Sequence, residues 1–121
     1  MNVDTARQAA ELLAPHLAGA SEGAVAVLHL DSGRRLIDTS FAEADSAALP
    51  VRDILAAALR LESEAVIVGL ARPSAGAMPG EADCPDARRL ADAAAALGVR
   101  LTDLFIFAGE DCHSFRELGL L

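Results

Sequence analysis

Aromatic and basic residues are scarce in this chain. It has no tryptophan, no tyrosine and no lysine, and its ten basic residues are arginines placed singly or as the pairs Arg34–Arg35 and Arg88–Arg89. Only four phenylalanines are present, and the formal net charge is −8 at pH 7. Nucleic-acid binding draws on clustered phosphate contacts and on aromatic platforms for bases. We therefore expect no direct binding of nucleic acid.

Cysteines and long apolar runs are also few. The two cysteines, Cys84 and Cys112, do not suggest a disulfide scaffold, and we expect both to be reduced thiols. The first residues show no basic segment followed by an apolar one, and no stretch approaches about 18 uninterrupted apolar residues. The sequence therefore indicates a cytoplasmic protein without a membrane segment.

Apolar residues are abundant, at 53% of 121 residues. A chain of this length and composition can bury one core without a metal or disulfides, so we expect a single domain over residues 1–121. A first helix is expected at about residues 4–18, where Thr5 and Gln8 can form a capping box and Pro15 disturbs the end. Its apolar stripe is Leu12, Leu13 and Leu17.

The rest of the chain alternates between strand and helix patterns. The apolar run 24–31, the turn "SGRR" and residues 35–41 predict a β-hairpin, which a polar stretch at 43–48 follows. Helical spacing then marks residues 51–62 through Ile54, Leu55, Ala58, Leu59 and Leu61. We further expect a buried strand at 64–70, a helix at 84–98 and a strand at 101–109. Pro85 and Asp86 suit the start of that helix, and Gly98 suits its end. Helices between apolar strands favour an α/β layer fold with a mixed sheet.

Three separated segments resemble a known family in order and spacing. They are "AALRLESEAVIVGLARPSAGAMPGEAD", "LGVRLTDLFIFAG" and the final "SFRELGLL", and the match covers roughly residues 24–121. Together they resemble the RadC group of JAB/MPN (JAMM) domains. The resemblance implies a three-layer, cytidine-deaminase-like fold in which helices flank a mixed central sheet. The helix-hairpin-helix DNA-binding region often found in that group is absent from these residues.

The family's JAMM motif, as the resemblance implies it, belongs to a zinc hydrolase. Two histidines and an aspartate hold the metal, a glutamate takes a proton from the bound water, and a serine steadies the oxyanion. Leu70 and Arg72 stand at the two histidine positions and Gly80 at the serine, so that only Asp83 matches. The glutamate position falls on Gly23 or on the neighbouring Glu22.

These replacements remove the metal chemistry. Leucine has no lone pair to donate, and arginine is a permanent cation that cannot ligate a metal, so we expect no zinc and no other cofactor. A rearranged site built from Asp83, Cys84, Cys112 and His113 is the alternative, although no recognised ligand spacing supports it. We expect the guanidinium of Arg72 to pair with the carboxylate of Asp83 instead.

Several of these residues also have purely structural interpretations. Asp83 suits the N-cap of a helix beginning at Cys84, and this capping role can coexist with the ion pair. Cys84, at a helix start, is either a reactive thiol or a quiet one. His29 in its apolar strand is expected to be a hydrogen-bonded core or surface histidine, and Ser74 an ordinary turn residue. His16 and His113 have no nearby sequence partner that argues for catalysis.

The functional hypothesis is a degenerate, zinc-free RadC-like JAB domain that binds a protein partner, as a homodimer or within a larger complex. Met78, in the loop, is the candidate interface residue. The tail residues are expected either to close the core or to join the interface: Phe115, Leu118, Leu120 and Leu121. Two alternatives are a metallopeptidase-like hydrolase with a non-standard metal site and a DNA-repair accessory protein.

Overall fold

A computed structural model of the chain describes residues 1–44 and 48–121. Helices and strands alternate along it in the order α1 (Ala6–Leu17), β1 (Ala24–Leu30), β2 (Leu36–Glu43), α2 (Val51–Arg60), β3 (Ala65–Ala71), α3 (Asp83–Ala96), β4 (Arg100–Ala108) and β5 (Asp111–Ser114). The polar stretch expected at 43–48 includes residues 45–47, which lie outside the described residues.

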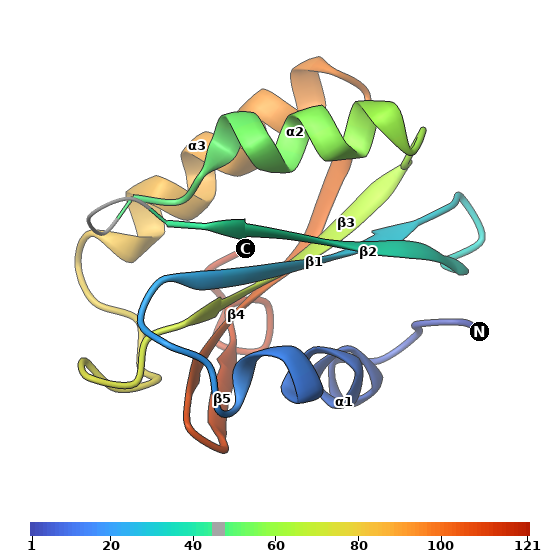
Figure 1. Cartoon of the computed structure of the whole chain (residues 1–121). Helices are drawn as coiled ribbons and strands as arrows, with labels where there is room; N and C mark the ends of the chain where they lie inside the picture. Colours follow the sequence, from blue (N-terminus) through green and yellow to red (C-terminus); the bar gives the residue numbers. More distant parts are fainter. Residues whose placement is uncertain (45–47) are drawn as a thin grey trace.

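The five strands form one mixed sheet in the order β2-β1-β3-β4-β5. The hairpin strands β1 and β2 are antiparallel, as are β1 and β3 and the final pair of β4 and β5. Strands β3 and β4 run parallel, with α3 as the crossover between them. The carboxyl ends of β3 and β4 therefore lie side by side, and the loop that leaves β3 begins at that edge (Figure 1).

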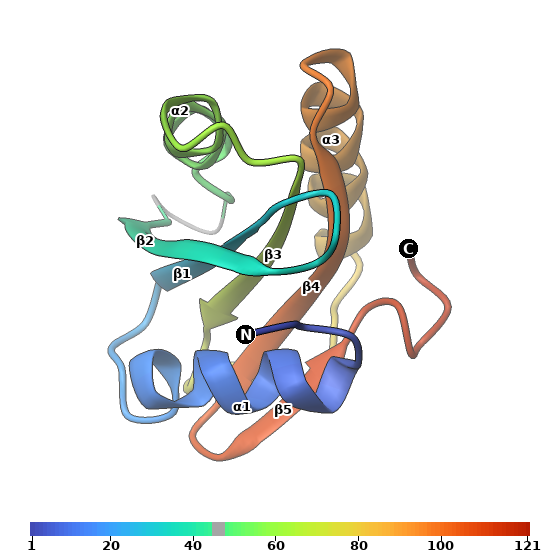
Figure 2. The same cartoon turned by 90° about the vertical axis from the view of Figure 1, so that its right-hand side faces the viewer.

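Helices cover both faces of the sheet and make three layers. Figure 2 shows α1 on one face and α2 with α3 on the other. Because side chains alternate along a strand, each central strand supplies both cores. Val66 and Val68 of β3 face Ile54 of α2 and Leu90 of α3, whereas Ile67 packs with Leu13 of α1. This is the α/β architecture that the sequence predicts.

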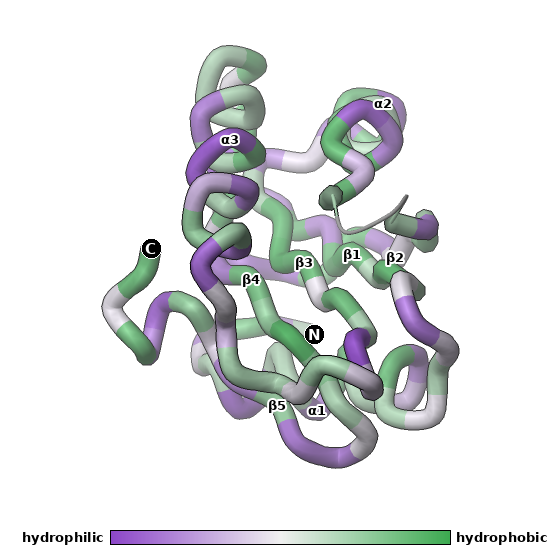
Figure 3. The backbone as a smooth tube through the Cα atoms, turned by 90° about the vertical axis from the view of Figure 1, so that its left-hand side faces the viewer, coloured by the Kyte–Doolittle hydropathy of each residue, from purple (hydrophilic) through white to green (hydrophobic). Residues whose placement is uncertain are grey.

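Close packing of α1 on β3 depends on a glycine. A Cβ atom added to Gly69 would lie 2.4 Å from Cδ1 of Leu17 and 3.2 Å from Cδ1 of Leu13. The side chain of Leu17 would have to move and that of Leu13 to shift by a few tenths of an ångström, so the glycine allows this close approach of the helix. The hydropathy colouring in Figure 3 is mainly green along β3 and β4, in keeping with strands that are buried on both faces.

Most expected elements are present, with local differences. The Thr5–Gln8 capping box begins α1, but the helix continues through Pro15 to Leu17. Leu59 is 53% exposed and does not belong to the buried stripe of α2, which instead includes Ala57. Gly98 follows the end of α3 with a φ of +77°, as expected of a residue that terminates a helix. None of the helices in the described part of the chain has the length and apolarity needed to cross a membrane.

The C-terminal segment differs from the expectation in two ways. Residues 111–114 form the edge strand β5, which their polar sequence did not predict. Phe115 is fully buried and closes the core against β4, but the last three leucines are between 36% and 42% exposed. Core closure by the tail therefore depends on Phe115 alone.

Candidate functional site

The candidate site is the loop from Arg72 to Ala82, which joins the end of β3 to the start of α3. The backbone N–H of Arg72 donates to the carbonyl of Phe107 at 2.7 Å, so Arg72 extends the parallel pairing of β3 and β4 by one residue. Its position is therefore set by the sheet. Gly76 turns the loop with a φ of +83°, a conformation that residues with a side chain rarely adopt.

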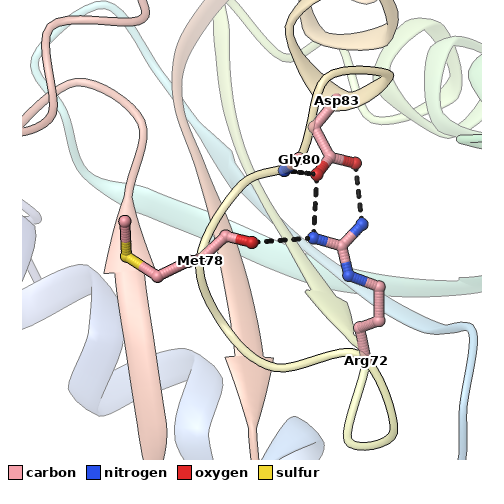
Figure 4. A network of polar contacts seen from close by, with 4 residues as sticks. All are labelled: Arg72, Met78, Gly80 and Asp83. Carbon is pink, nitrogen blue, oxygen red and sulfur yellow. Dashed lines mark hydrogen bonds and ion pairs between the residues drawn. The ribbon is translucent and has the colours of Figure 1, made fainter.

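Arg72 and Asp83 form a bidentate ion pair across the two ends of this loop. Nη1 of Arg72 donates to Oδ1 of Asp83 at 2.7 Å, and Nη2 donates to Oδ2 at 2.8 Å (Figure 4). The side chains are only 20% and 11% exposed. A guanidinium matches a carboxylate in this fork geometry better than any other side chain does, and the partial burial strengthens the attraction.

Two backbone groups of the loop join the ion pair. The N–H of Gly80 donates to Oδ2 of Asp83 at 2.5 Å, and Nη2 of Arg72 donates to the carbonyl of Met78 at 3.3 Å. The hydrogen bonds from Arg72 hold the pKa of Asp83 below its ordinary value, and the carboxylate in turn raises the pKa of Arg72. Nε of Arg72 is buried and has no acceptor among the described residues.

The geometry does not support the N-cap role considered for Asp83. Helix α3 begins at Asp83 itself rather than at Cys84, and the cap residue is Ala82, which makes no side-chain capping bond. The carboxylate of Asp83 accepts from Gly80, which precedes the helix, and from Arg72. Its negative charge still lies in the first turn, where the helix dipole favours it.

Glu22 contacts the same loop from the segment that precedes β1. Its Oε1 accepts one hydrogen bond from the backbone N–H of Ser74 at 3.0 Å and another from the Ser74 hydroxyl at 2.7 Å. These bonds lower the pKa of Glu22, with a smaller contribution from the charge of Arg72. Gly23 donates to the carbonyl of Ala71, which holds this segment beside the end of β3. Ser74, expected to be an ordinary turn residue, therefore also ties the loop to Glu22.

The side chains at the motif positions do not fit a zinc ion. Leu70 is 8% exposed and packs in the core below α2 and α3, and Gly80 contributes only its backbone. The positive charge of Arg72 repels a cation near Asp83, and both oxygens of Asp83 already accept hydrogen bonds. Neutral nitrogen, thiolate or free carboxylate donors, which a zinc site requires, are not provided by these positions.

The alternative metal site is not assembled either. Within the described ranges, no group of three or more His, Cys, Asp or Glu side chains lies close enough to hold a metal ion. Cys84 and Cys112 are both free thiols. Cys112 lies on β5 and packs against the core on the α1 face, where burial raises its pKa. Nδ1 of His113 is buried and has no hydrogen-bond partner in the part of the chain described.

Two further sequence candidates have clear environments. His29 is fully buried, and its two ring nitrogens lie 2.7 Å from the hydroxyls of Ser63 and Ser40, so it is a hydrogen-bonded core histidine. Met78 is 60% exposed at the surface of the loop, while its carbonyl faces Arg72 (Figure 4). The loop is thus anchored by polar groups and presents an apolar side chain.

Comparison with known proteins agrees with the family resemblance. A family model described as "RadC-like JAB domain" matches residues 3–120. Proteins named UPF0758 are similar to the chain. One from Pseudoalteromonas translucida is 32% identical over 114 residues, which are 92% of this chain and 51% of that protein. One from Vibrio cholerae is 35% identical over 116 residues, which are 92% of this chain and 72% of the relative. One from Acidithiobacillus ferrooxidans is 36% identical over 97 residues, which are 78% of this chain and 43% of that protein.

The chain thus spans about half the length of the first of these relatives. The five-stranded mixed sheet between helical layers agrees with a JAB/MPN-like fold. The names of these relatives state no activity.

Proposed function

The chain belongs to the RadC-like JAB domain family, and from this membership we propose that it is a zinc-free member that acts through binding, as a protein-binding or structural module. One observation carries the proposal. The bidentate pair of Arg72 and Asp83 lies where the resemblance puts a metal and its ligands. An internal guanidinium supplies the positive charge there and holds the loop against α3.

The loop suits binding because polar contacts fix it at both ends. Glu22 secures Ser74 near the start of the loop, and Asp83 secures Gly80 near its end. An anchored loop loses little conformational entropy when a partner binds, which favours affinity. Met78 presents its side chain between these anchors, and the expected partner is a protein or a second copy of the chain.

Neither alternative gains a supporting observation. A metallopeptidase-like hydrolase requires a cluster of metal donors, and the described residues provide none. A DNA-processing accessory protein that binds DNA directly requires a basic surface, whereas this chain has a net charge of −8. We therefore propose the binding module in preference to both.

Elemental analysis tests the proposal directly. The protein is purified without a metal-affinity step and without chelator, dialysed, and assayed for zinc. We expect well below one zinc per chain and a melting temperature that is unchanged by a chelator, because folding does not depend on a metal. Close to one zinc per chain that survives dialysis would overturn the zinc-free assignment.

A further inference from the structure

A second candidate site lies away from the loop, on the α1 face near the start of β4. A cavity of about 410 Å³ opens there between the N-terminal segment, the turn joining β1 to β2, and the C-terminal tail. Its lining includes the apolar residues Val3, Ala9 and Ile67, each of which is less than 5% exposed. Figure 2 shows α1, the hairpin and β5 around this side of the sheet. The volume falls within the range of small-molecule sites, about 300–1,000 Å³.

Arg34 contributes to this cavity from a strained backbone position. Its φ is +63°, in the left-handed region that favours glycine. The turn is fixed around it, because Oδ1 of Asp31 accepts from the N–H groups of Gly33 and Arg35, both at 2.9 Å. The carbonyl of Arg34 also accepts from Val3. An arginine therefore stands at a turn position where glycine would relieve the strain, and this residue lines the cavity.

Arg116 reaches the same cavity from the C-terminal tail. Its backbone N–H donates to Oδ1 of Asp103 at 3.0 Å, and its Nη1 donates to the carbonyl of Thr102 at 3.3 Å. Among the described residues, no carboxylate oxygen lies within 4.0 Å of the guanidinium of either Arg34 or Arg116. Arg34 and Arg116, from distant parts of the sequence, thus line one cavity, and neither forms an ion pair among the described residues.

Acidic residues at the same cavity limit what it can accept. Asp103 is 3% exposed, and its carboxylate already accepts from the backbone of Leu104 and Arg116 and from the hydroxyl of Ser114. Asp4 and Glu117 also line the cavity and oppose a ligand of high negative charge. A single carboxylate is therefore favoured over a polyphosphate.

We propose that this cavity binds a small monocarboxylate with an apolar body. The carboxylate accepts charge-assisted hydrogen bonds from Arg34 and Arg116, and the apolar body packs on Val3, Ala9 and Ile67. The site is separate from the loop at Arg72 and does not depend on the function proposed for that loop.

The test is a titration of the isotope-labelled protein with 4-methylpentanoate, followed by the backbone amide signals in NMR spectra. The neutral 4-methylpentanamide and inorganic phosphate serve as comparison ligands. We expect saturable shifts that centre on Ala6, Thr102 and Arg116, with the amide binding at least roughly tenfold more weakly, as the loss of a charge-assisted contact implies. Phosphate is expected to bind more weakly than the carboxylate.

Three variants sharpen the test. Arg34→Gly removes the guanidinium and relieves the strained φ, so we expect binding to fall at least roughly tenfold while the melting temperature stays the same or rises. Arg116→Met should weaken binding similarly, and Arg88→Met, an exposed arginine on α3, should leave it unchanged. Equal affinity for acid and amide, shifts that centre elsewhere, or no saturation by roughly 10 mM carboxylate would each overturn the proposal.

Discussion

The guanidinium of Arg72 and the carboxylate of Asp83 meet through two parallel hydrogen bonds of 2.7 and 2.8 Å. Because both side chains are largely buried, removing either one leaves the other charge poorly solvated. We expect Arg72→Met to lower the free energy of unfolding by about 2 kcal/mol, the size of a lost hydrogen bond to a charged group. Chemical denaturation of Arg72→Met, Asp83→Asn and the double variant measures the coupling.

The control for this double-mutant cycle lies on α3, the helix that also carries Asp83. Asp86 and Arg89 form an ion pair at 3.2 Å in which the arginine is 61% exposed. An exposed pair of this kind contributes about 0–1 kcal/mol, so Arg89→Met should change stability much less than Arg72→Met does. Strictly additive effects of the Arg72 and Asp83 substitutions would show that the two side chains do not stabilise one another.

Much of the fold could be predicted because its signals are local. The capping box of Thr5 and Gln8, the "SGRR" turn and the helix-ending Gly98 each depend on residues a few positions apart. Strand β5 could not be predicted, because "DCHS" has no apolar alternation and its place is fixed by pairing with residues 105–108. Pairing across the sheet supplies what the local sequence lacks.

In the candidate site, too, one contact could be predicted from the sequence and another could not. Arg72 and Asp83 are 11 positions apart, and the expectation that they pair came from the family motif, which places both residues in one site, together with their opposite charges. Glu22 and Ser74 are 52 positions apart, and only the antiparallel pairing of β1 with β3 brings them together. A glutamate and a serine carry no signal for one another in sequence, so this contact required the structure.

The Glu22–Ser74 contact leads to a prediction about loop motion. Ser74→Ala removes the hydroxyl donor and leaves the backbone N–H, so we expect a small change in melting temperature but faster exchange of the amide hydrogens of residues 74–78 and Gly80. Glu22→Gln should act in the same direction, because its amide oxygen is a weaker acceptor than a carboxylate. Glu11→Gln, on the exposed side of α1, is the matched control. Unchanged exchange in the loop of both variants would show that Glu22 does not anchor it.

Restoring the histidines tests the proposed positions of the motif. Leu70→His combined with Arg72→His adds two metal ligands beside Asp83 and frees that carboxylate from its guanidinium. We expect this double variant to bind zinc with about one ion per chain, measured by equilibrium dialysis and elemental analysis, and to be stabilised thermally by zinc. The single variant Arg72→His, in which Leu70 is unchanged, is the comparison with one metal ligand fewer. A folded double variant that takes up no more zinc than the wild type would contradict the assignment of these positions.

Met78 provides the prediction for the binding surface. Its side chain is 60% exposed, and an aspartate there places a charge in any contact that excludes water. If a second copy of the chain is the partner, we expect light scattering after size separation to show a dimer or larger species that Met78→Asp weakens at least roughly tenfold. Leu97→Asp, at another exposed apolar residue beyond α3, is the control. A wild-type protein that is monomeric at high concentration would exclude self-association and leave another protein as the partner to be sought.

His29 provides the prediction for pH dependence. Burial lowers its pKa in the folded protein, an effect to which the charge of Arg60 adds and which the charge of Asp38 opposes. The unfolded chain therefore binds a proton near the ordinary histidine pKa of about 6.5, whereas the folded chain binds one at this position only at a lower pH. The contribution of His29 to the free energy of unfolding should be fully present above that value and fall as the pH drops from about 7 toward 5, with a slope of at most about 1.4 kcal/mol per pH unit from this group.

The variant His29→Gln tests this prediction, because glutamine can still hydrogen bond to Ser63 and Ser40 but cannot titrate. Its free energy of unfolding in urea should therefore lose this part of the pH dependence. Equal slopes in the two proteins between pH 7 and 5 would show that His29 titrates alike in both states.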